Sequence, residues 1–223
     1  LLIIEDAAQA FGASKNQKMA GTFSSAGAFS MNPMKTLGGY GEAGVVVTND
    51  KAIHNKLLIL RHAGTVKTDD PYVTNYCTEV SLNHKMDTLN AALLMISLNN
   101  FKEKIAKREK IALSLDHLLG QYVETPACDS NETHGRYVYP IRLEARDKLM
   151  QFLQNRQVET KVFNKPLACD APIYRKFKTT PVPNSELLVQ QNLIIPSHEK
   201  LTSNQLNYIG EVFAEFFKSN HDS

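Results

Sequence analysis

The chain has 223 residues, of which 43% are apolar and 22% charged, and its formal net charge is +2. This is the composition of a globular protein with one large domain or two small ones, and the scattered charges do not favour nucleic-acid binding. Three widely spaced cysteines without a CxxC pair argue against a disulfide framework or a zinc site and favour a cytoplasmic protein. No apolar run approaches the ~18 residues of a membrane span.

Residues 1–4 are four consecutive large apolar side chains, the pattern of a strand buried on both faces of a parallel sheet. Because the chain begins inside this strand without a methionine or a leader, we expect the true start of the protein to lie upstream. The strand ends at Glu5 and Asp6, and ligands bind at the C-terminal ends of strands in open α/β sheets. Taken alone, Asp6 is more simply explained as the N-cap of a helical turn over 7–12.

Two more strands are expected over 27–31 and 43–48, and the three strands together indicate part of a mostly parallel α/β sheet. The turn between them carries Lys35 and four glycines, which we expect to adopt positive φ and to let the backbone approach a ligand. Ser30 ends the second strand close to Lys35, although a turn-forming serine is its simpler explanation. A buried lysine amine can form a Schiff base, and a carboxylate nearby can keep a ring nitrogen protonated.

Apolar residues at helical spacing predict helices over 51–61, 88–100 and 101–119. The polar loop over 65–81 is long enough to be functional or to face a partner.

From residue 122 onward the pattern becomes α+β. It predicts strands over 137–143 and 159–163, helices over 146–156, 186–193 and 201–218, an extended segment over 193–196 and a proline-rich loop over 166–183. We therefore predict two domains, with residues 1–110 as the C-terminal part of a large α/β domain and residues 111–223 as a small α+β domain.

Several short motifs follow one another in a fixed order: 5–10 (EDAAQA), 28–30 (AFS), 35–37 (KTL), 41–44 (GEAG), 61–64 (RHAG) and Asn83. In this order they resemble the DegT-type sugar aminotransferases, most closely over residues 3–110. The resemblance implies a pyridoxal-phosphate enzyme of the aspartate-aminotransferase fold, with a mostly parallel-sheet large domain and a smaller α+β domain. Such enzymes install amino groups on nucleotide-linked keto-sugars.

The resemblance also implies a role for each matching residue. Lys35 would bind the cofactor as a Schiff base and later move the substrate proton. Asp6 would pair with the ring nitrogen, Gln9 would lie against the ring, and Ser30 would bind the phosphate. Asn83 would reach the phosphate of the partner subunit, so we expect a homodimer with shared active sites, and no metal ion.

A lysine at position 35, where the dehydratase branch of the family has histidine, favours transamination with an amino acid such as glutamate as donor. The alternatives are a pyridoxal-phosphate-dependent sugar dehydratase, a non-catalytic truncated copy that acts through dimerisation or binding, and a Rossmann-like domain for an unrelated ligand. Two departures from the family stand out. Segment 163–169 lacks the family's histidine, and we find no phosphate-binding turn or ring-stacking aromatic, so the isolated chain is expected to bind the cofactor poorly.

Overall fold

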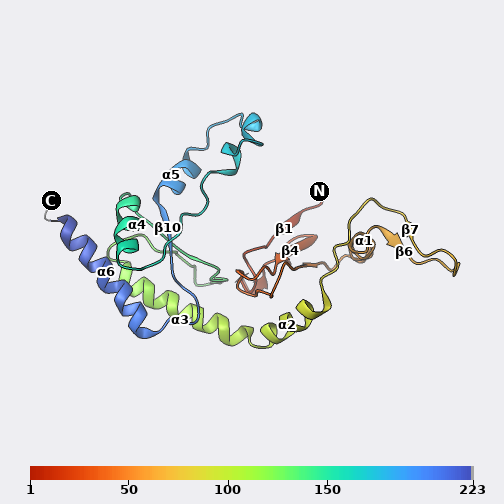
Figure 1. The fold of residues 1–223 in the computed structure, drawn as a ribbon, viewed down its shortest axis with the longest axis horizontal. Helices are drawn as coiled ribbons and strands as arrows, with labels where there is room; N and C mark the ends of the chain where they lie inside the picture. The colour runs from red at the N-terminus through yellow and green to blue at the C-terminus, as the bar shows by residue number, and fades with distance from the viewer. Residues whose placement is uncertain (222–223) are drawn as a thin grey trace. The chain divides into compact units, whose positions relative to one another are not determined.

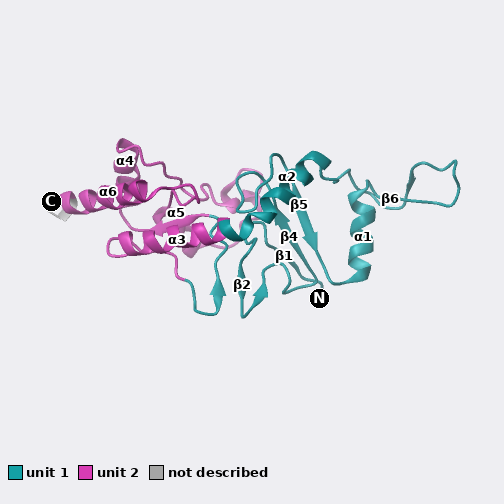
Figure 2. Cartoon of the chain, turned by 90° about the horizontal axis from the view of Figure 1, so that it is seen from below, with its two compact units in different colours: residues 1–103, 128–137 teal, residues 104–127, 138–223 magenta. Residues whose placement is uncertain are grey.

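The computed structural model describes residues 1–221, which form two compact units (Figures 1 and 2). Unit 1 comprises residues 1–103 and 128–137, and unit 2 comprises residues 104–127 and 138–223. The predicted division into two domains, 1–110 and 111–223, stays a prediction. The two compact units instead change at residue 104, and residues 128–137 belong to unit 1.

Unit 1 is built on a three-stranded sheet of order β1-β4-β5, formed by β1 (Ile4–Asp6), β4 (Ala26–Ser30) and β5 (Gly44–Val47). Strands β1 and β4 are parallel because the connection over 7–25 is long enough to carry the chain back to the starting edge. Strands β4 and β5 are antiparallel because the shorter connection between them holds only a turn. The mostly parallel sheet of the fold class is thus represented by one parallel and one antiparallel pair.

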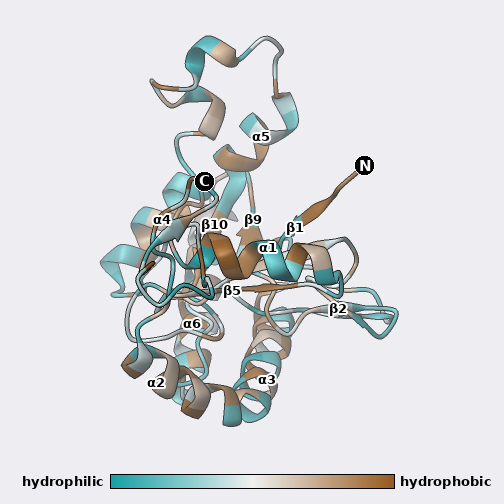
Figure 3. Ribbon diagram, turned by 90° about the vertical axis from the view of Figure 1, so that its right-hand side faces the viewer, coloured by the Kyte–Doolittle hydropathy of each residue, from teal (hydrophilic) through white to brown (hydrophobic). Residues whose placement is uncertain are grey.

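The first strand differs from its prediction in burial. It begins at Ile4, and the side chains of Leu1, Leu2, Ile3 and Ile4 are all exposed. Among the described strands β1 pairs only with β4, so its other edge has no neighbour. The prediction of a strand buried on both faces is therefore wrong for these residues in this structure. Figure 3 shows β5 and the segment that leads from the N-terminus into β1 as hydrophobic.

Three helices form where the periodicity predicts them: α1 (Lys51–Arg61), α2 (Thr88–Asn99) and α3 (Phe101–Leu119). The first two begin at aspartates. The Asp50 carboxylate accepts hydrogen bonds from the N–H groups that open α1, and Asp87 does the same for α2. The predicted helical turn over 7–12 is wrong, since these residues form only non-helical turns.

Short strands appear in unit 1 where the sequence predicts none. A hairpin of β2 (Ser14–Lys15) and β3 (Lys18–Met19) pairs with β8 (Glu132–Thr133), and β6 (Thr65–Val66) pairs with β7 (Tyr76–Cys77) inside the predicted loop over 65–81. Two-residue strands are too short to display the alternation that identifies a strand in a sequence.

Unit 2 places β9 (Tyr139–Arg142) antiparallel to β10 (Asn192–Ile195), together with α4 (Arg146–Asn155), α5 (Pro183–Gln191) and α6 (Ser203–His221). The predicted strand over 159–163 is wrong, because only a single bridge from Lys161 to Ile194 forms there. The helix predicted over 186–193 instead begins at Pro183, a residue suited to the first helical turn. The predicted loop over 166–183 contains two short 3₁₀ helices, η1 (Ala168–Asp170) and η2 (Arg175–Phe177).

A continuous hydrophobic core lies in unit 2. It joins the inner faces of α3, α4 and α6 to both strands. Its fully buried side chains include Leu115, Leu119, Tyr139, Ile141, Leu149, Leu153, Leu193 and Phe213. Unit 1 has a much smaller cluster of Met31, Leu37 and Leu94, which lies against the turn that follows β4.

Candidate active site

The candidate site lies at the edge of the β1-β4-β5 sheet where β1 and β4 end. Because these two strands are parallel, their C-terminal residues Asp6 and Ser30 lie at this same end of the sheet. Asp6 is paired with Ala28, and Ser30 follows Ala28 by two positions, so the pleat directs Asp6 and Ser30 to the same face of the sheet. Glu5 and Phe29 occupy the opposite face. The structure therefore brings together two of the predicted site residues by strand register alone.

Lys35 stands on the turn that leaves this edge. The turn is closed by hydrogen bonds from the N–H of Met31 to the carbonyl of Ala43 (2.8 Å), and from the N–H of Gly39 to the carbonyl of Met31 (2.8 Å). Lys35 is half-buried and is followed by the buried Thr36. The lysine is thus held on a closed, partly buried turn that follows Ser30 at the end of β4.

A segment distant in sequence also contacts this turn. The Lys35 Nζ atom lies over the ring of Tyr137, 4.5 Å from its centroid. The Thr36 hydroxyl donates a buried hydrogen bond of 3.2 Å to the carbonyl of Gly135. Residues 134–137 belong to the same compact unit as the turn. The sequence analysis missed this contact, and no local signal predicts it, because the partners of the hydrogen bond are 99 positions apart.

The glycines of the turn serve a purpose other than the predicted one. None of Gly38, Gly39, Gly41 or Gly44 has a positive φ, so that expectation is wrong. Close packing explains two of them. A Cβ on Gly39 would lie 2.6 Å from the Oδ1 atom of Asn90, and a Cβ on Gly38 would lie 2.5 Å from a backbone carbonyl oxygen.

Asn90, on α2, fastens the glycine-rich part of the turn. Its Oδ1 atom accepts a hydrogen bond of 3.0 Å from the N–H of Tyr40, and its Nδ2 atom donates one of 3.5 Å to the carbonyl of Glu42. The sequence analysis did not single out this residue. No local signal predicts this contact, because Asn90 and Tyr40 are 50 positions apart in the chain.

Asp6 and Gln9 are both exposed. The Asp6 carboxylate accepts one hydrogen bond of 3.1 Å, from the N–H of Ala8, which is the turn-forming role that it shares with many aspartates. Among the described contacts this leaves its second oxygen open to a ligand. Gln9 follows in an exposed turn, and no described hydrogen bond joins its side chain to Lys35.

Asn83 is exposed and lies apart from the contacts described above. Its backbone forms a bridge with His62 after α1, and its Oδ1 atom accepts a hydrogen bond of 3.3 Å from the N–H of Lys85. No described contact links Asn83 with Asp6, Ser30 or Lys35. Its predicted role concerns the partner subunit, and this single chain does not test that role.

Glu5, on the face opposite Asp6, anchors the end of β1. Its carboxylate accepts hydrogen bonds from the backbone N–H groups of Gly21 (2.7 Å), Phe23 (2.5 Å) and Ser24 (2.9 Å). Partial burial acts to raise the pKa of this carboxyl, but the N–H donors together outweigh that effect and lower the pKa below its ordinary value. Glu5 is therefore a structural acid, and Asp6 is the one available to a ligand.

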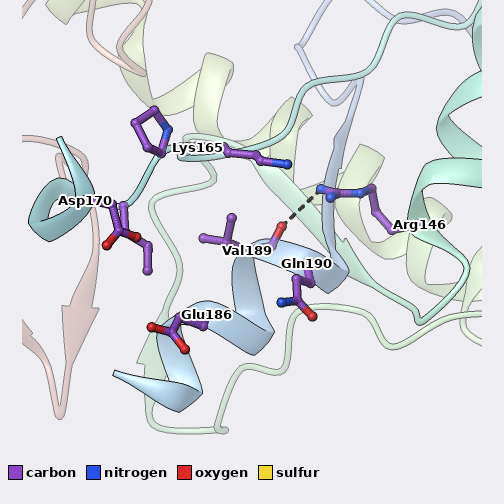
Figure 4. A pocket seen from close by; sticks show the side chains of 8 residues that line it. Arg146, Lys165, Asp170, Glu186, Val189 and Gln190 are labelled. Atoms are coloured by element: carbon purple, nitrogen blue, oxygen red, sulfur yellow. Dashed lines mark hydrogen bonds between the residues drawn. The ribbon is translucent and has the colours of Figure 1, made fainter. Parts of the chain in front are cut away.

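A cavity of about 250 Å³ lies within unit 2, between the start of α4, helix α5 and the segment before η1 (Figure 4). It is lined by Arg146, Lys165, Pro166, Leu167, Asp170, Glu186, Val189 and Gln190.

The charged groups of this cavity are largely paired. Lys178 binds both acids, with Nζ distances of 2.8 Å to Asp170 and 3.1 Å to Glu186, and these hydrogen bonds raise the pKa of its amine. One guanidinium nitrogen of Arg146 donates to the carbonyl of Val189 at 3.1 Å (Figure 4). The cavity is therefore a polar recess whose arginine supports the end of α5.

Neither a metal-binding cluster of three or more His, Cys, Asp or Glu side chains nor a helix able to cross a membrane occurs in the part of the chain that the structure describes.

Comparison with known proteins identifies similar chains. The model of the DegT/DnrJ/EryC1/StrS aminotransferase family matches residues 1–214. The "pleiotropic regulatory protein" of Geobacillus stearothermophilus is 31% identical, with 98% of this chain and 59% of that protein covered. The UDP-2-acetamido-2-deoxy-3-oxo-D-glucuronate aminotransferase of Pseudomonas aeruginosa is also 31% identical, with 93% of this chain and 56% of that protein covered.

Among solved structures, a DegT DnrJ EryC1 StrS aminotransferase from Brucella abortus superimposes with a TM-score of 0.90 at 28% identity, over 97% of this chain and 57% of that one. At this score the two chains share a fold, so the predicted fold class is confirmed. The chain spans less than two thirds of the length of each of these relatives.

Proposed function

The chain belongs to the DegT/DnrJ/EryC1/StrS aminotransferase family, and from this membership we propose that the protein transfers an amino group to a nucleotide-linked keto-sugar. An amino acid, with glutamate as the expected choice, is the donor. The P. aeruginosa relative supports this class of substrate, because its name specifies a UDP-linked 3-oxo sugar acid. It also favours transamination over the dehydration that the sequence left as an alternative.

Aminotransferases of this family depend on pyridoxal phosphate, and we propose the same cofactor for this protein. The residues present fit it. A half-buried amine, an exposed carboxylate with an open oxygen and a hydroxyl lie on the turn and strand ends of a single sheet edge. When bound, such a cofactor acts as an electron sink for the bonds broken at the substrate carbon.

In this proposal each side chain performs a specific task. Lys35 would hold the cofactor covalently, and its amine would later take and return the proton at the substrate carbon. The Asp6 carboxylate would keep a proton on the ring nitrogen, and the Ser30 hydroxyl would donate to the phosphate. Gln9 would pack against the ring, and Asn83 would reach the phosphate of the partner subunit.

The observation that carries the proposal is the shared edge and face of Asp6 and Ser30 beside the Lys35 turn. It follows from the parallel register of β1 and β4, and a one-residue shift of register would turn one of the two side chains to the other face.

A homodimer and a cytoplasmic location are parts of the same proposal. Helix α2 supports the dimer, because Leu89, Met95 and Ile96 are exposed apolar side chains on one short helix, and exposed apolar surface of this kind favours association. The three cysteines are unpaired, which is usual in a reducing compartment.

The first test is covalent. The full-length protein is incubated with pyridoxal phosphate, reduced with borohydride and digested, and the adduct is located by mass spectrometry. We expect it on Lys35, and we expect Lys35→Ala to lose both the adduct and transamination. An adduct on another lysine alone, or full activity of Lys35→Ala, would contradict the proposal.

The second test concerns the reaction. A panel of UDP-, dTDP- and GDP-linked keto-sugars is mixed with the protein and glutamate, and 2-oxoglutarate is measured. Production of 2-oxoglutarate with an amino sugar supports transamination. Loss of water from the sugar without 2-oxoglutarate would identify the dehydratase alternative, and no reaction with any sugar would favour the non-catalytic one.

A further inference from the structure

The structure places an aromatic ring directly against the amine of Lys35. The Nζ atom lies 4.5 Å from the centroid of the Tyr137 ring, which is within the ~6 Å at which the negative face of an aromatic ring attracts a cation. Lysine has a flexible four-carbon stem, so a ring at this distance restricts the positions that the amine can take. A lysine that must carry a proton needs such a restriction.

Tyr137 reaches this place because the chain before it is firmly held. Arg136 is buried and has a left-handed backbone, with φ of 47°, and its N–H donates a hydrogen bond of 2.9 Å to the Nδ1 atom of His134. Gly135 accepts the buried hydrogen bond from Thr36. The bend at Arg136 and the bond to Thr36 therefore fix the approach of residues 134–137 to the lysine turn.

We propose that Tyr137 is a positioning residue for Lys35. Its ring would hold the ammonium that forms when the Lys35 amine takes the substrate proton, so that the proton is returned from a fixed position. The proposal rests on the proposed function for the role of Lys35, but the contact itself does not. The ring face, and not the phenol hydroxyl, is the active feature, so phenylalanine at this position is expected to replace tyrosine and an aliphatic side chain is not.

The chain offers a matched control. Lys18 lies over the ring of Phe23, 5.0 Å from its centroid, in the same unit, and no described contact joins this pair to Lys35. Phe23→Leu removes a lysine–ring contact of the same kind without touching Lys35.

The contact is tested by NMR of the cofactor-free protein with labelled lysine. A ring above the amine shifts the Lys35 Hε signals upfield, and Lys35→Arg assigns them. We expect the shift in the native protein and in Tyr137→Phe, and its loss in Tyr137→Leu. Phe23→Leu should leave the Lys35 signals in place. An unshifted Lys35 signal in the native protein would overturn the proposal.

The role is tested by steady-state kinetics of the same variants with saturating cofactor. We expect Tyr137→Leu to lower kcat about tenfold, with KM for the sugar changed by less than twofold, and Tyr137→Phe and Phe23→Leu to remain within twofold of the native protein. An unchanged kcat in Tyr137→Leu, or an equal loss in Tyr137→Phe, would overturn the positioning role. If the native protein forms no borohydride adduct on Lys35, the proposed function fails, and with it the positioning role, while the NMR result still decides whether the ring holds the amine.

Discussion

The two units of the chain differ in how they bury apolar surface. Unit 2 has a continuous core that runs through α3, α4, α6 and both strands of its sheet. Unit 1 buries only Met31, Leu37 and Leu94 as a cluster, and α1 has no buried residue at all. Since burial of apolar side chains is the main source of folding stability, unit 2 has the larger internal stabilisation, and unit 1 depends more on caps and polar contacts.

The two units also differ in the groups that bind a partly buried glutamate. Glu5 in unit 1 is bound by backbone N–H groups. Glu199 in unit 2 is bound by side-chain cations, with 2.8 Å to the Nε atom of Arg108 and 3.5 Å to the Nζ atom of Lys104. Hydrogen bonds to fixed backbone groups are local, whereas ion pairs are screened by salt. The two units are therefore expected to respond differently to mutation, pH and salt.

The largest effect is expected in the core of unit 2. Phe213 is fully buried, and Phe213→Ala should lower the free energy of unfolding by about 3–5 kcal/mol, because it removes the ring and leaves a cavity. Urea denaturation measures the loss. As the counterpart in unit 1, Leu58→Ala at an exposed position of α1 should change the free energy of unfolding by no more than about 0.5 kcal/mol. Equal losses in the two variants would contradict the contrast between the units.

The next effect concerns the backbone-bound acid of unit 1. Glu5→Gln should destabilise the start of the sheet by about 1–3 kcal/mol, because an amide has one acceptor oxygen in place of two and turns an N–H₂ group toward other donors. Faster amide hydrogen exchange at Gly21 and Ser24 is the measurement. The control is Glu211→Gln, at an exposed acid on α6 that has no described partner. If exchange at Gly21 is unchanged, Glu5 does not anchor β1.

The smallest effect on the free energy of unfolding is expected for Glu199, the ion-paired acid of unit 2, and this effect depends on pH. Burial acts to raise the pKa of Glu199, but backbone hydrogen bonding and the charges of Arg108 and Lys104 outweigh it, so the pKa in the folded protein is lowered. Its stabilisation is therefore present above the unfolded pKa of about 4.3 and is lost as the pH falls through the folded value. Glu199→Gln should cost about 1 kcal/mol at pH 7.

Two comparisons check this expectation. Urea denaturation gives the free energy of unfolding of the native protein and of Glu199→Gln. The difference between these two free energies should disappear in acid, and at pH 7 it should shrink as sodium chloride is added. The corresponding difference for Glu5→Gln should change little with salt. A Glu199→Gln difference that is independent of both pH and salt would show that its ion pairs do not contribute.

Some residues of the candidate site could be predicted from the local sequence, and others could not. Asp6, Ser30 and Lys35 could be selected because Asp6 and Ser30 end strands and Lys35 lies on the next turn, in a recognisable order of motifs, and strand ends can be read from hydrophobic patterns. Tyr137 and Asn90 could not be selected, because their contacts with the turn join residues far apart in the chain. The packing role of Gly38 and Gly39 was missed for the same reason.

The sequence by itself determined the family, the bounds of α1 and α3 and the order of residues around Lys35, because these depend on periodicity, capping and short motifs that neighbouring residues encode. Only the tertiary structure decided which face Asp6 and Ser30 share, which ring lies against Lys35 and which apolar side chains are buried. The physical reason is that register and burial depend on what packs against a segment, and those partners lie elsewhere in the chain.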